Sequence, residues 1–295
     1  MIINMKEQRI INLDHLNILE IVGKGASELL QGQLTCDLEK VKNRSFELGA
    51  ICNTKGRVIN SFILCKAPSK ELDTYWLICN ENMINRTKEV LNKYSPFYEV
   101  QIEELNHVNF YGVSSDAIKK EFGVEILENN EFYSSEGKHI FSYLQKSLCL
   151  VLVDKSIDIF KEENTMDLDL SEWHLDNINS KEVEINLDNS ELFTPHELNF
   201  DVNKRIDFEK GCYTGQEIIA RMHYRAKTLP RLRLVKSNSA LPNLNTKVLS
   251  KSQKPIGSII SALKFEQELL ILISIKATEE EIFLENSTEI LEFID

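Results

Sequence analysis

One cysteine in the chain lies in a setting that could make its thiol reactive. Cys212 stands between two glycines in the stretch EKGCYTGQEIIARMHYR, directly before a segment with helical spacing. Unpaired N–H groups at a helix N-terminus lower the pKa of a thiol, and Lys210 and Arg221 could add positive charge if they face it. Glu217, in the first turn, would partly counter thiolate formation. Because a cysteine is more often a small buried residue, this stretch alone leaves packing and reactivity both open.

Other patterns that carry chemistry are missing from the sequence. His223 follows Cys212 by eleven residues in the same predicted helix, so we expect its imidazole to lie far from the sulfur and not to form a hydrolase pair. The six histidines form no HxH or HExxH pattern and the six cysteines form no CxxC pair. There is no Walker loop, GxGxxG or GxSxG. We therefore expect no resident metal, although Cys212 could supply one ligand to a transient iron–sulfur cluster.

The charge balance of the chain argues against a nucleic-acid binder. Its 295 residues hold 34 Lys and Arg against 46 Asp and Glu, a net charge of −12, which repels a phosphate backbone unless a basic patch is segregated. One dense basic cluster follows the cysteine, and it is either a solvated face or an RNA site: Arg221, Arg225, Lys227, Arg231 and Arg233. We do not expect direct nucleic-acid binding.

The location and assembly of the protein can be predicted only coarsely. The first residues form no signal peptide, and no stretch approaches the roughly 20 apolar residues that span a bilayer. The unpaired cysteines favour a reducing cytoplasm. No long amphipathic seam stands out, so we expect a monomer that does not associate with a membrane.

Strands and helices alternate irregularly, which predicts an α+β fold without the regular βαβ order of a doubly wound sheet. Ser27 is expected to cap a short helix, and Gly56 to form the turn of a hairpin. The main predicted strands are 15–22, 46–53, 57–65 and 75–79, and the main predicted helices are 81–93, 115–122 and 156–163. After Pro230 short strands follow one another closely, which predicts a small C-terminal β-barrel or sandwich. We therefore divide the chain into residues 1–228 and 229–295.

Four blocks of this sequence resemble those of one protein family. They are GKGASELLQGQLTCDL, CNTKGRVINSF, FTPHELNF and KGCYTGQEIIAR. In this order and spacing they resemble the YgfZ-type folate-binding proteins, relatives of the glycine-cleavage T-protein, which is an aminomethyltransferase. The resemblance covers most of residues 15–235. It implies a ring of three domains, with two interleaved α+β domains in the first part and a small β-barrel that closes the ring.

The resemblance also implies a function and a site. The family role is accessory: it maintains iron–sulfur enzymes, including a tRNA-thiolating radical enzyme, with a tetrahydrofolate-like ligand in a central channel. The expected partners are therefore iron–sulfur enzymes or their assembly factors. Cys212 matches the cysteine regarded as the functional centre. The residues that match the rest of that signature are Lys210, Gly211, Tyr213, Gly215, Gln216, Glu217 and Arg221.

Departures from the relatives bear on the ligand and on the reaction. Where the T-protein has two aspartates, this chain has Asn60 and Ser61, which cannot act as carboxylate bases. A folate-dependent aminomethyl- or methyltransferase is therefore the weaker alternative. The candidate folate contacts are Asn179, His196 and Asn199. Asn179 stands where folate-binding relatives have a glutamate, and His196 where they have a glutamine.

Overall fold

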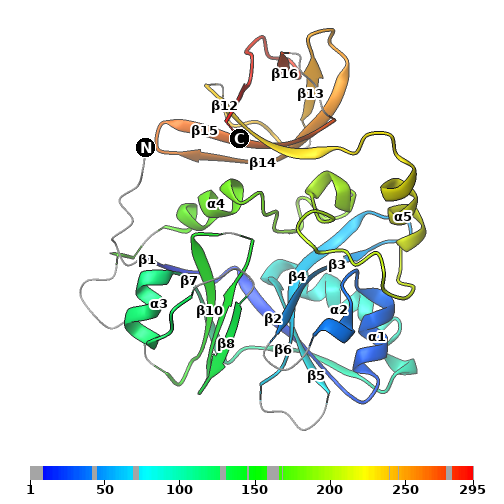
Figure 1. Ribbon diagram of the computed structural model, residues 1–295, viewed down its shortest axis with the longest axis vertical. Helices are drawn as coiled ribbons and strands as arrows, with labels where there is room; N and C mark the ends of the chain where they lie inside the picture. Colours follow the sequence, from blue (N-terminus) through cyan, green and yellow to red (C-terminus); the bar gives the residue numbers. More distant parts are fainter. Residues whose placement is uncertain are drawn as a thin grey trace.

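The protein is built from three β-sheets that stack with helices between and around them (Figure 1). The structure is a computed structural model that describes residues 9–41, 45–68, 73–126, 131–144, 146–157, 166–167, 169–238, 240–244, 246–276 and 281–294. In Figure 1 the C-terminal sheet lies above the other two, and α4 (Leu170–Asn179) lies between. No described helix is long and apolar enough to cross a bilayer.

The central sheet has the order β3-β4-β5-β2-β6, with every neighbouring pair antiparallel. Its strands are β2 (Leu16–Val22), β3 (Phe46–Cys52), β4 (Val58–Lys66), β5 (Thr74–Asn80) and β6 (Gln101–Leu105). Helices α1 (Ala26–Gln33) and α2 (Ile84–Asn92) pack against it, along with the short helices η1 (Leu38–Lys40), η2 (Glu81–Met83) and η3 (Ser95–Phe97). The hairpin predicted around Gly56 is confirmed, with φ +70° at that glycine.

The second sheet interleaves with the central one along the chain. Its order is β11-β1-β7-β10-β9-β8, so β1 enters this sheet before the chain crosses to the central sheet and returns. Its strands are β1 (Arg9–Asn12), β7 (Val108–Ser114), β8 (Glu131–Ser135), β9 (Lys138–Ser142), β10 (Leu148–Asp154) and β11 (Met166–Asp167), and α3 (Ser115–Phe122) accompanies it.

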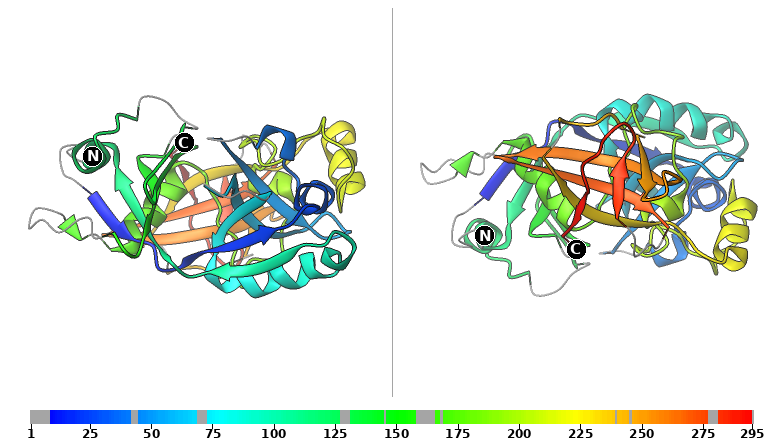
Figure 2. Two further views of the ribbon diagram at one scale, coloured as in Figure 1. Left: turned by 90° about the horizontal axis from the view of Figure 1, so that it is seen from below. Right: turned by 90° about the horizontal axis from the view of Figure 1, so that it is seen from above.

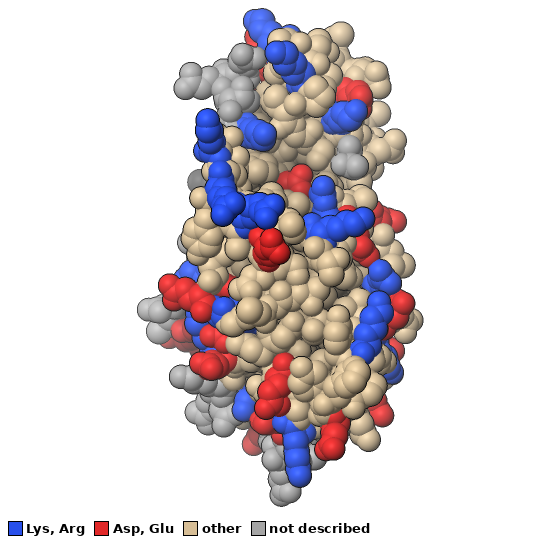
Figure 3. Space-filling view, turned by 90° about the vertical axis from the view of Figure 1, so that its right-hand side faces the viewer, with Lys and Arg blue, Asp and Glu red and all other residues tan. Residues whose placement is uncertain are grey.

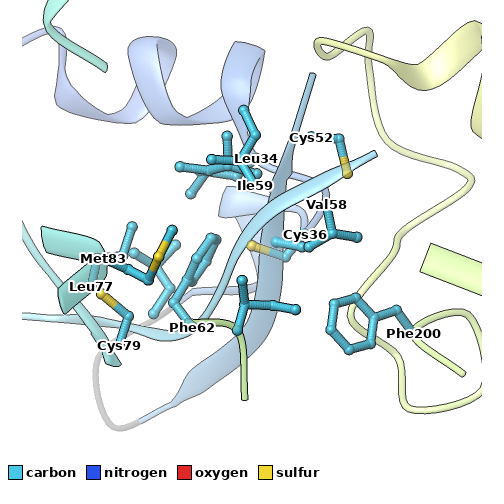
Figure 4. Close-up of a cluster of buried hydrophobic side chains, with 14 of the residues drawn as sticks. Leu34, Cys36, Cys52, Val58, Ile59, Phe62, Leu77, Cys79, Met83 and Phe200 are labelled. Carbon is cyan, nitrogen blue, oxygen red and sulfur yellow. The ribbon is translucent and has the colours of Figure 1, made fainter. Parts of the chain in front are cut away.

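Apolar side chains cover both faces of the central sheet, which explains the nearly continuous apolar run of β4. On one face Phe62 packs in a cluster with Leu34, Leu77 and Phe200 (Figure 4). On the other face β4 meets the second sheet and Trp173 of α4. The segment that carries Cys212 contributes Tyr213 to the first cluster, so the thiol loop is attached to the main core.

The C-terminal sheet is curled but is not a closed barrel (Figure 2). Its order is β16-β13-β14-β15-β12-β17, formed by β12 (Arg231–Ser237), β13 (Lys247–Ser250), β14 (Pro255–Phe265), β15 (Glu268–Ile275), β16 (Ile282–Leu284) and β17 (Glu292–Phe293). Between the two edges the described residues form an isolated bridge, Phe283 to Ile290, and no ladder. The α+β class is confirmed, and the predicted small barrel is a curled half-barrel whose described edge strands β16 and β17 do not form a ladder with each other.

Three local predictions have different outcomes. Ser27 does not cap α1: the helix begins at Ala26 and its cap is Gly25, where a Cβ would lie 2.3 Å from the Tyr98 carbonyl oxygen. The helix predicted over 156–163 lies mostly outside the described residues. β12 begins close to the predicted boundary, but the division of the chain at residue 228 stays a prediction.

Candidate functional site

Cys212 is the one cysteine of the six whose side chain is exposed. Figure 4 shows three of the others, Cys36, Cys52 and Cys79, within the apolar cluster on one face of the central sheet. Burial raises the pKa of these three thiols to about 12, which keeps them protonated and unreactive near neutral pH. The sequence left packing and reactivity open for Cys212, and its exposure excludes packing.

Lys210, two residues before the cysteine, anchors the thiol loop to the end of α1. Lys210 is buried, and its Nζ donates hydrogen bonds to the carbonyl oxygens of Gln31 (2.8 Å), Leu34 (2.7 Å) and Cys36 (2.8 Å). Carbonyls at the end of α1 have no partner within the helix, so the ammonium caps them. The expectation that Lys210 charges the thiol is not supported, since its three acceptors lie on the α1 side; burial lowers its own pKa to about 8.

The residues after the cysteine are anchored to the same helix. Tyr213 is buried with its ring 5.2 Å from the Lys210 Nζ, and within the described part of the chain its hydroxyl has no hydrogen-bond partner. Thr214 donates its N–H to the Gly32 carbonyl (3.2 Å) and its hydroxyl to Gln33 Oε1 (3.1 Å). The exposed thiol is therefore presented by a loop that is fixed on both sides.

The two glycines that bracket Cys212 have different roles. Gly215 is the N-cap of α5 (Gln216–Arg225) with φ +87°, and a Cβ there would lie 2.6 Å from the Asn53 carbonyl oxygen. The fold therefore requires glycine at this position. A Cβ on Gly211 would meet no atom within 4 Å, so the fold does not require glycine there.

We expect Gly215→Ala to lower the free energy of unfolding by about 2 kcal/mol, because it combines an unfavourable φ with a backbone clash. Urea denaturation of purified protein measures this difference. Gly211→Ala is the matched control and should change stability by less than about 0.5 kcal/mol. Equal losses in the two variants would contradict the different roles of these glycines.

The remaining charged residues of the signature face solvent on α5. Glu217 and Arg221 are exposed and form an i, i+4 ion pair at 3.2 Å, while Gln216 is half-buried. The helix begins four residues after Cys212, so the cysteine precedes its first turn. Glu217 and Arg221 therefore pair with each other and not with the Cys212 thiol.

The basic cluster of the sequence is divided among different contacts. Arg231 forms a two-pronged bond to Asp201, with both nitrogen–oxygen distances 2.9 Å, and Arg233 lies over the Phe293 ring at 4.4 Å. Figure 3, which faces the α5 side, shows Lys and Arg side chains interspersed with acidic ones. This arrangement is more typical of a solvated face than of an RNA-binding groove.

The three candidate folate contacts do not form one pocket. Asn179 is exposed at the end of α4, and no hydrogen bond among the described residues joins it to the other two. Asn199, with φ +54°, accepts the Leu232 N–H at 3.0 Å and so fixes the start of β12. His196, in η4 (Pro195–Leu198), is fully buried, and neither of its ring nitrogens has a hydrogen-bond partner among the described residues.

A buried polar cavity lies between the central and second sheets, and sequence reasoning missed the residues that line it. Arg205 donates to the carbonyls of Gly49 (3.2 Å) and Phe62 (2.8 Å) and pairs with Glu182, whose second oxygen has no partner. The cavity measures about 30 Å³, room for about one water molecule. The signal in the sequence was two acidic residues, 182 and 184, alternating with buried apolar ones.

Glu184 is the centre of a hydrogen-bond network beside this cavity. It accepts from the indole of Trp173 (2.8 Å) and from Asn177 (3.0 Å), and lies 3.1 Å from His15 Nε2. Burial acts to raise its pKa, but the bond to His15, the positive charges of His15 and Lys146 and the indole bond outweigh burial and hold the pKa at about 2. The network therefore stabilises the ionised carboxylate.

This low pKa predicts loss of stability in acid. Between the usual value of 4.5 and about 2, the unfolded chain binds a proton at Glu184 that the folded chain does not, so the contribution of Glu184 falls as pH falls. The full shift corresponds to about 3 kcal/mol. Urea unfolding at pH 5 and pH 3 should show about 2 kcal/mol of this loss in the wild type, because pH 3 is still above the folded pKa, and Glu184→Gln should lack that component. Identical pH dependence in both proteins would contradict it.

Asn60 and Ser61 have structural roles. Both are buried; Asn60 donates to Thr87 Oγ1 at 2.7 Å, and Ser61 accepts the Ile185 N–H at 3.2 Å. Neither side chain is a carboxylate. An aminomethyltransferase mechanism therefore has no acid or base from these two residues.

Similar proteins share most of the length of this chain. The tRNA-modifying protein YgfZ of Colwellia psychrerythraea is 26% identical over 287 residues, which cover 93% of this chain and 87% of that protein. The YgfZ protein of Buchnera aphidicola is 29% identical over 265 residues, which cover 86% and 78%. The resemblance to YgfZ-type proteins is confirmed. No family model matches the chain.

A solved structure confirms the fold that these relatives imply. The glycine cleavage system aminomethyltransferase T from Bartonella henselae superposes with a TM-score of 0.74 and 14% sequence identity, covering 98% of this chain and 85% of that one. The aminomethyltransferase-like fold is therefore shared, while the low identity leaves the chemistry open.

Proposed function

We propose that this chain is an accessory protein that maintains iron–sulfur enzymes, supports tRNA modification and acts through the Cys212 thiol. The observation that carries the proposal is the exposure of Cys212 on a loop fixed by Lys210 and Thr214, while the other five thiols are buried. The YgfZ relatives are named as tRNA-modifying proteins, which supports the proposal.

The chemistry fits an accessory role better than independent turnover. A thiolate can bind iron as one ligand of a cluster, but four ligands complete a site, so the other ligands would come from a client protein. Among the described residues, no hydrogen bond or ion pair joins an acid or a base to the Cys212 side chain. A Cβ on Gly211 would meet no atom within 4 Å, so there is free space beside the thiol through which a client protein can approach the backbone. We place the protein in the reducing cytoplasm, where an exposed thiol persists.

Deletion of the gene tests the role directly. We expect lower activity of iron–sulfur enzymes and less methylthiolated tRNA in the deletion strain, with recovery when the wild-type gene is returned. Full activity of both in the deletion strain would contradict the proposal.

Tetrahydrofolate is the ligand that the resemblance implies, and the cavity does not fit it. The unpartnered oxygen of Glu182 is the kind of acceptor that a pterin edge needs, but about 30 Å³ holds one water and not a bicyclic ring. We therefore assign no step to folate. If a reduced folate binds, the cavity must open.

Calorimetric titration with tetrahydrofolate tests this point. We expect no measurable heat of binding with the wild type. Asn179→Glu restores the glutamate of the folate-binding relatives and is the matched comparison: binding by this variant alone would locate the pocket at the end of α4. Micromolar binding by the wild type would contradict the closed cavity.

A further inference from the structure

A cluster of side chains with metal-binding chemistry is formed by residues outside the signature around Cys212. His196 of η4, Asp201 of the following turn and His223 of α5 each offer one ligand atom, and these atoms lie within 4.8 Å of one another. In the sequence 22 positions separate Asp201 from His223, so no short motif reveals the cluster. The fold brings these residues together where η4, α5 and the start of β12 meet.

His196 is the strongest indication that the cluster has a ligand. Its side chain is fully buried, and neither its Nδ1 nor its Nε2 has a hydrogen-bond partner in the described structure. The Nδ1 of His223 is also buried without a partner. An unsatisfied buried polar group costs about 1–3 kcal/mol, so a cluster of three nitrogens in this state needs an explanation.

The neighbouring groups hold the cluster in an orientation that suits a metal. The ring of Phe208 stacks on His223 with centroids 3.9 Å apart and fixes the plane of that imidazole. The Asp201 side chain is 4% exposed, and Arg231 bonds to both of its oxygens. A carboxylate has about four lone-pair sites, so these two bonds leave sites for a cation, and a ligating carboxylate is commonly hydrogen-bonded in this way.

We propose that His196, Asp201 and His223 bind a divalent first-row transition metal such as Zn²⁺. Two imidazole nitrogens and one carboxylate oxygen are the ligands that such ions accept, and three protein ligands leave a fourth position open to water or to a client's side chain. Bond lengths of about 2.0–2.1 Å require each donor to move inward by less than about 1 Å.

None of the three ligand residues belongs to the signature around Cys212, so the metal site is independent of the function proposed for that thiol.

Cobalt and zinc titrations of the full chain test the site. Cys212→Ser is used as the parent, so that the exposed thiol contributes no ligand. We expect one Co²⁺ per chain with visible absorption of a four- or five-coordinate ion, displacement by Zn²⁺, and a rise in Tm with Zn²⁺. His196→Gln and His223→Gln should each weaken binding at least about 100-fold.

His107→Gln, at an exposed histidine outside the cluster, is the matched control and should bind as tightly as the parent. His223 is only half-buried, so its variant is expected to fold even if His196→Gln does not, and circular dichroism verifies this. Loss of stoichiometric binding in the Cys212→Ser parent, or unchanged binding in His223→Gln, would overturn the proposal.

Discussion

Cys212→Ala is expected to lower the ability of the protein to restore iron–sulfur enzyme activity in a deletion strain at least about tenfold, while stability changes by less than about 0.5 kcal/mol. The functional loss follows because no other thiol is exposed, and a methyl group cannot bind iron. Stability is unaffected because the side chain contacts solvent and no core cluster includes it. The measurements are enzyme activity in cell extracts at matched protein level and urea unfolding of the purified variant.

Cys36→Ala is the matched control, since it removes a thiol from the core. Cys36 is 1% exposed, and its sulfur lies in the apolar cluster of Figure 4. We expect a stability loss of about 1–2 kcal/mol from the cavity that forms, with restoration of enzyme activity retained at permissive temperature. The opposite pattern in the two variants would indicate that Cys212 is structural.

Arg205→Met is expected to have the largest effect on stability, about 3–5 kcal/mol. The variant leaves the carboxylate of Glu182 buried without its partner and removes the donors to the Gly49 and Phe62 carbonyls. Burial acts to raise the pKa of Glu182 and Arg205 opposes it, so the carboxyl group becomes easier to protonate in the variant. Urea denaturation at pH 7 measures the loss.

Two further variants test whether the unpaired charge causes this loss. Arg205→Met combined with Glu182→Leu should be about 1–3 kcal/mol more stable than Arg205→Met alone, because the buried charge is gone. Arg86→Met breaks an ion pair with Glu191 in which both side chains are more than a third exposed, and it should lose less than about 1 kcal/mol. Similar losses in Arg205→Met and Arg86→Met would contradict the account.

Sequence patterns predicted most of the helices and strands and singled out Cys212, but they did not show where the side chains around the cysteine point. The β3–β4 hairpin follows from a local turn at Gly56, and the signature around Cys212 can be recognised from its residue types alone. Lys210 could not be placed in the same way, because its three carbonyl acceptors belong to the last turn of α1 and the residues just after it, some 175 residues away along the chain. The same holds for Arg205 and Glu182, whose partners are set by the packing of two sheets.

Long-range geometry also limited the prediction of the site. Asn199 was expected to contact a ligand, but its positive φ and the bond to Leu232 give it a backbone role that no residue pattern reveals. His196 and His223 looked like unrelated single histidines until the fold placed them beside Asp201. The closure of the barrel depended on whether short strands at its edges could pair, which periodicity alone does not decide.

Methylthiolated nucleosides in tRNA are the most direct readout of the central claim. They are quantified by mass spectrometry in a deletion strain that expresses either the wild type or Cys212→Ala at equal level. We predict that the wild type restores the modification and that Cys212→Ala leaves it at the level of the deletion strain. Equal restoration by both proteins would contradict a role for the Cys212 thiol.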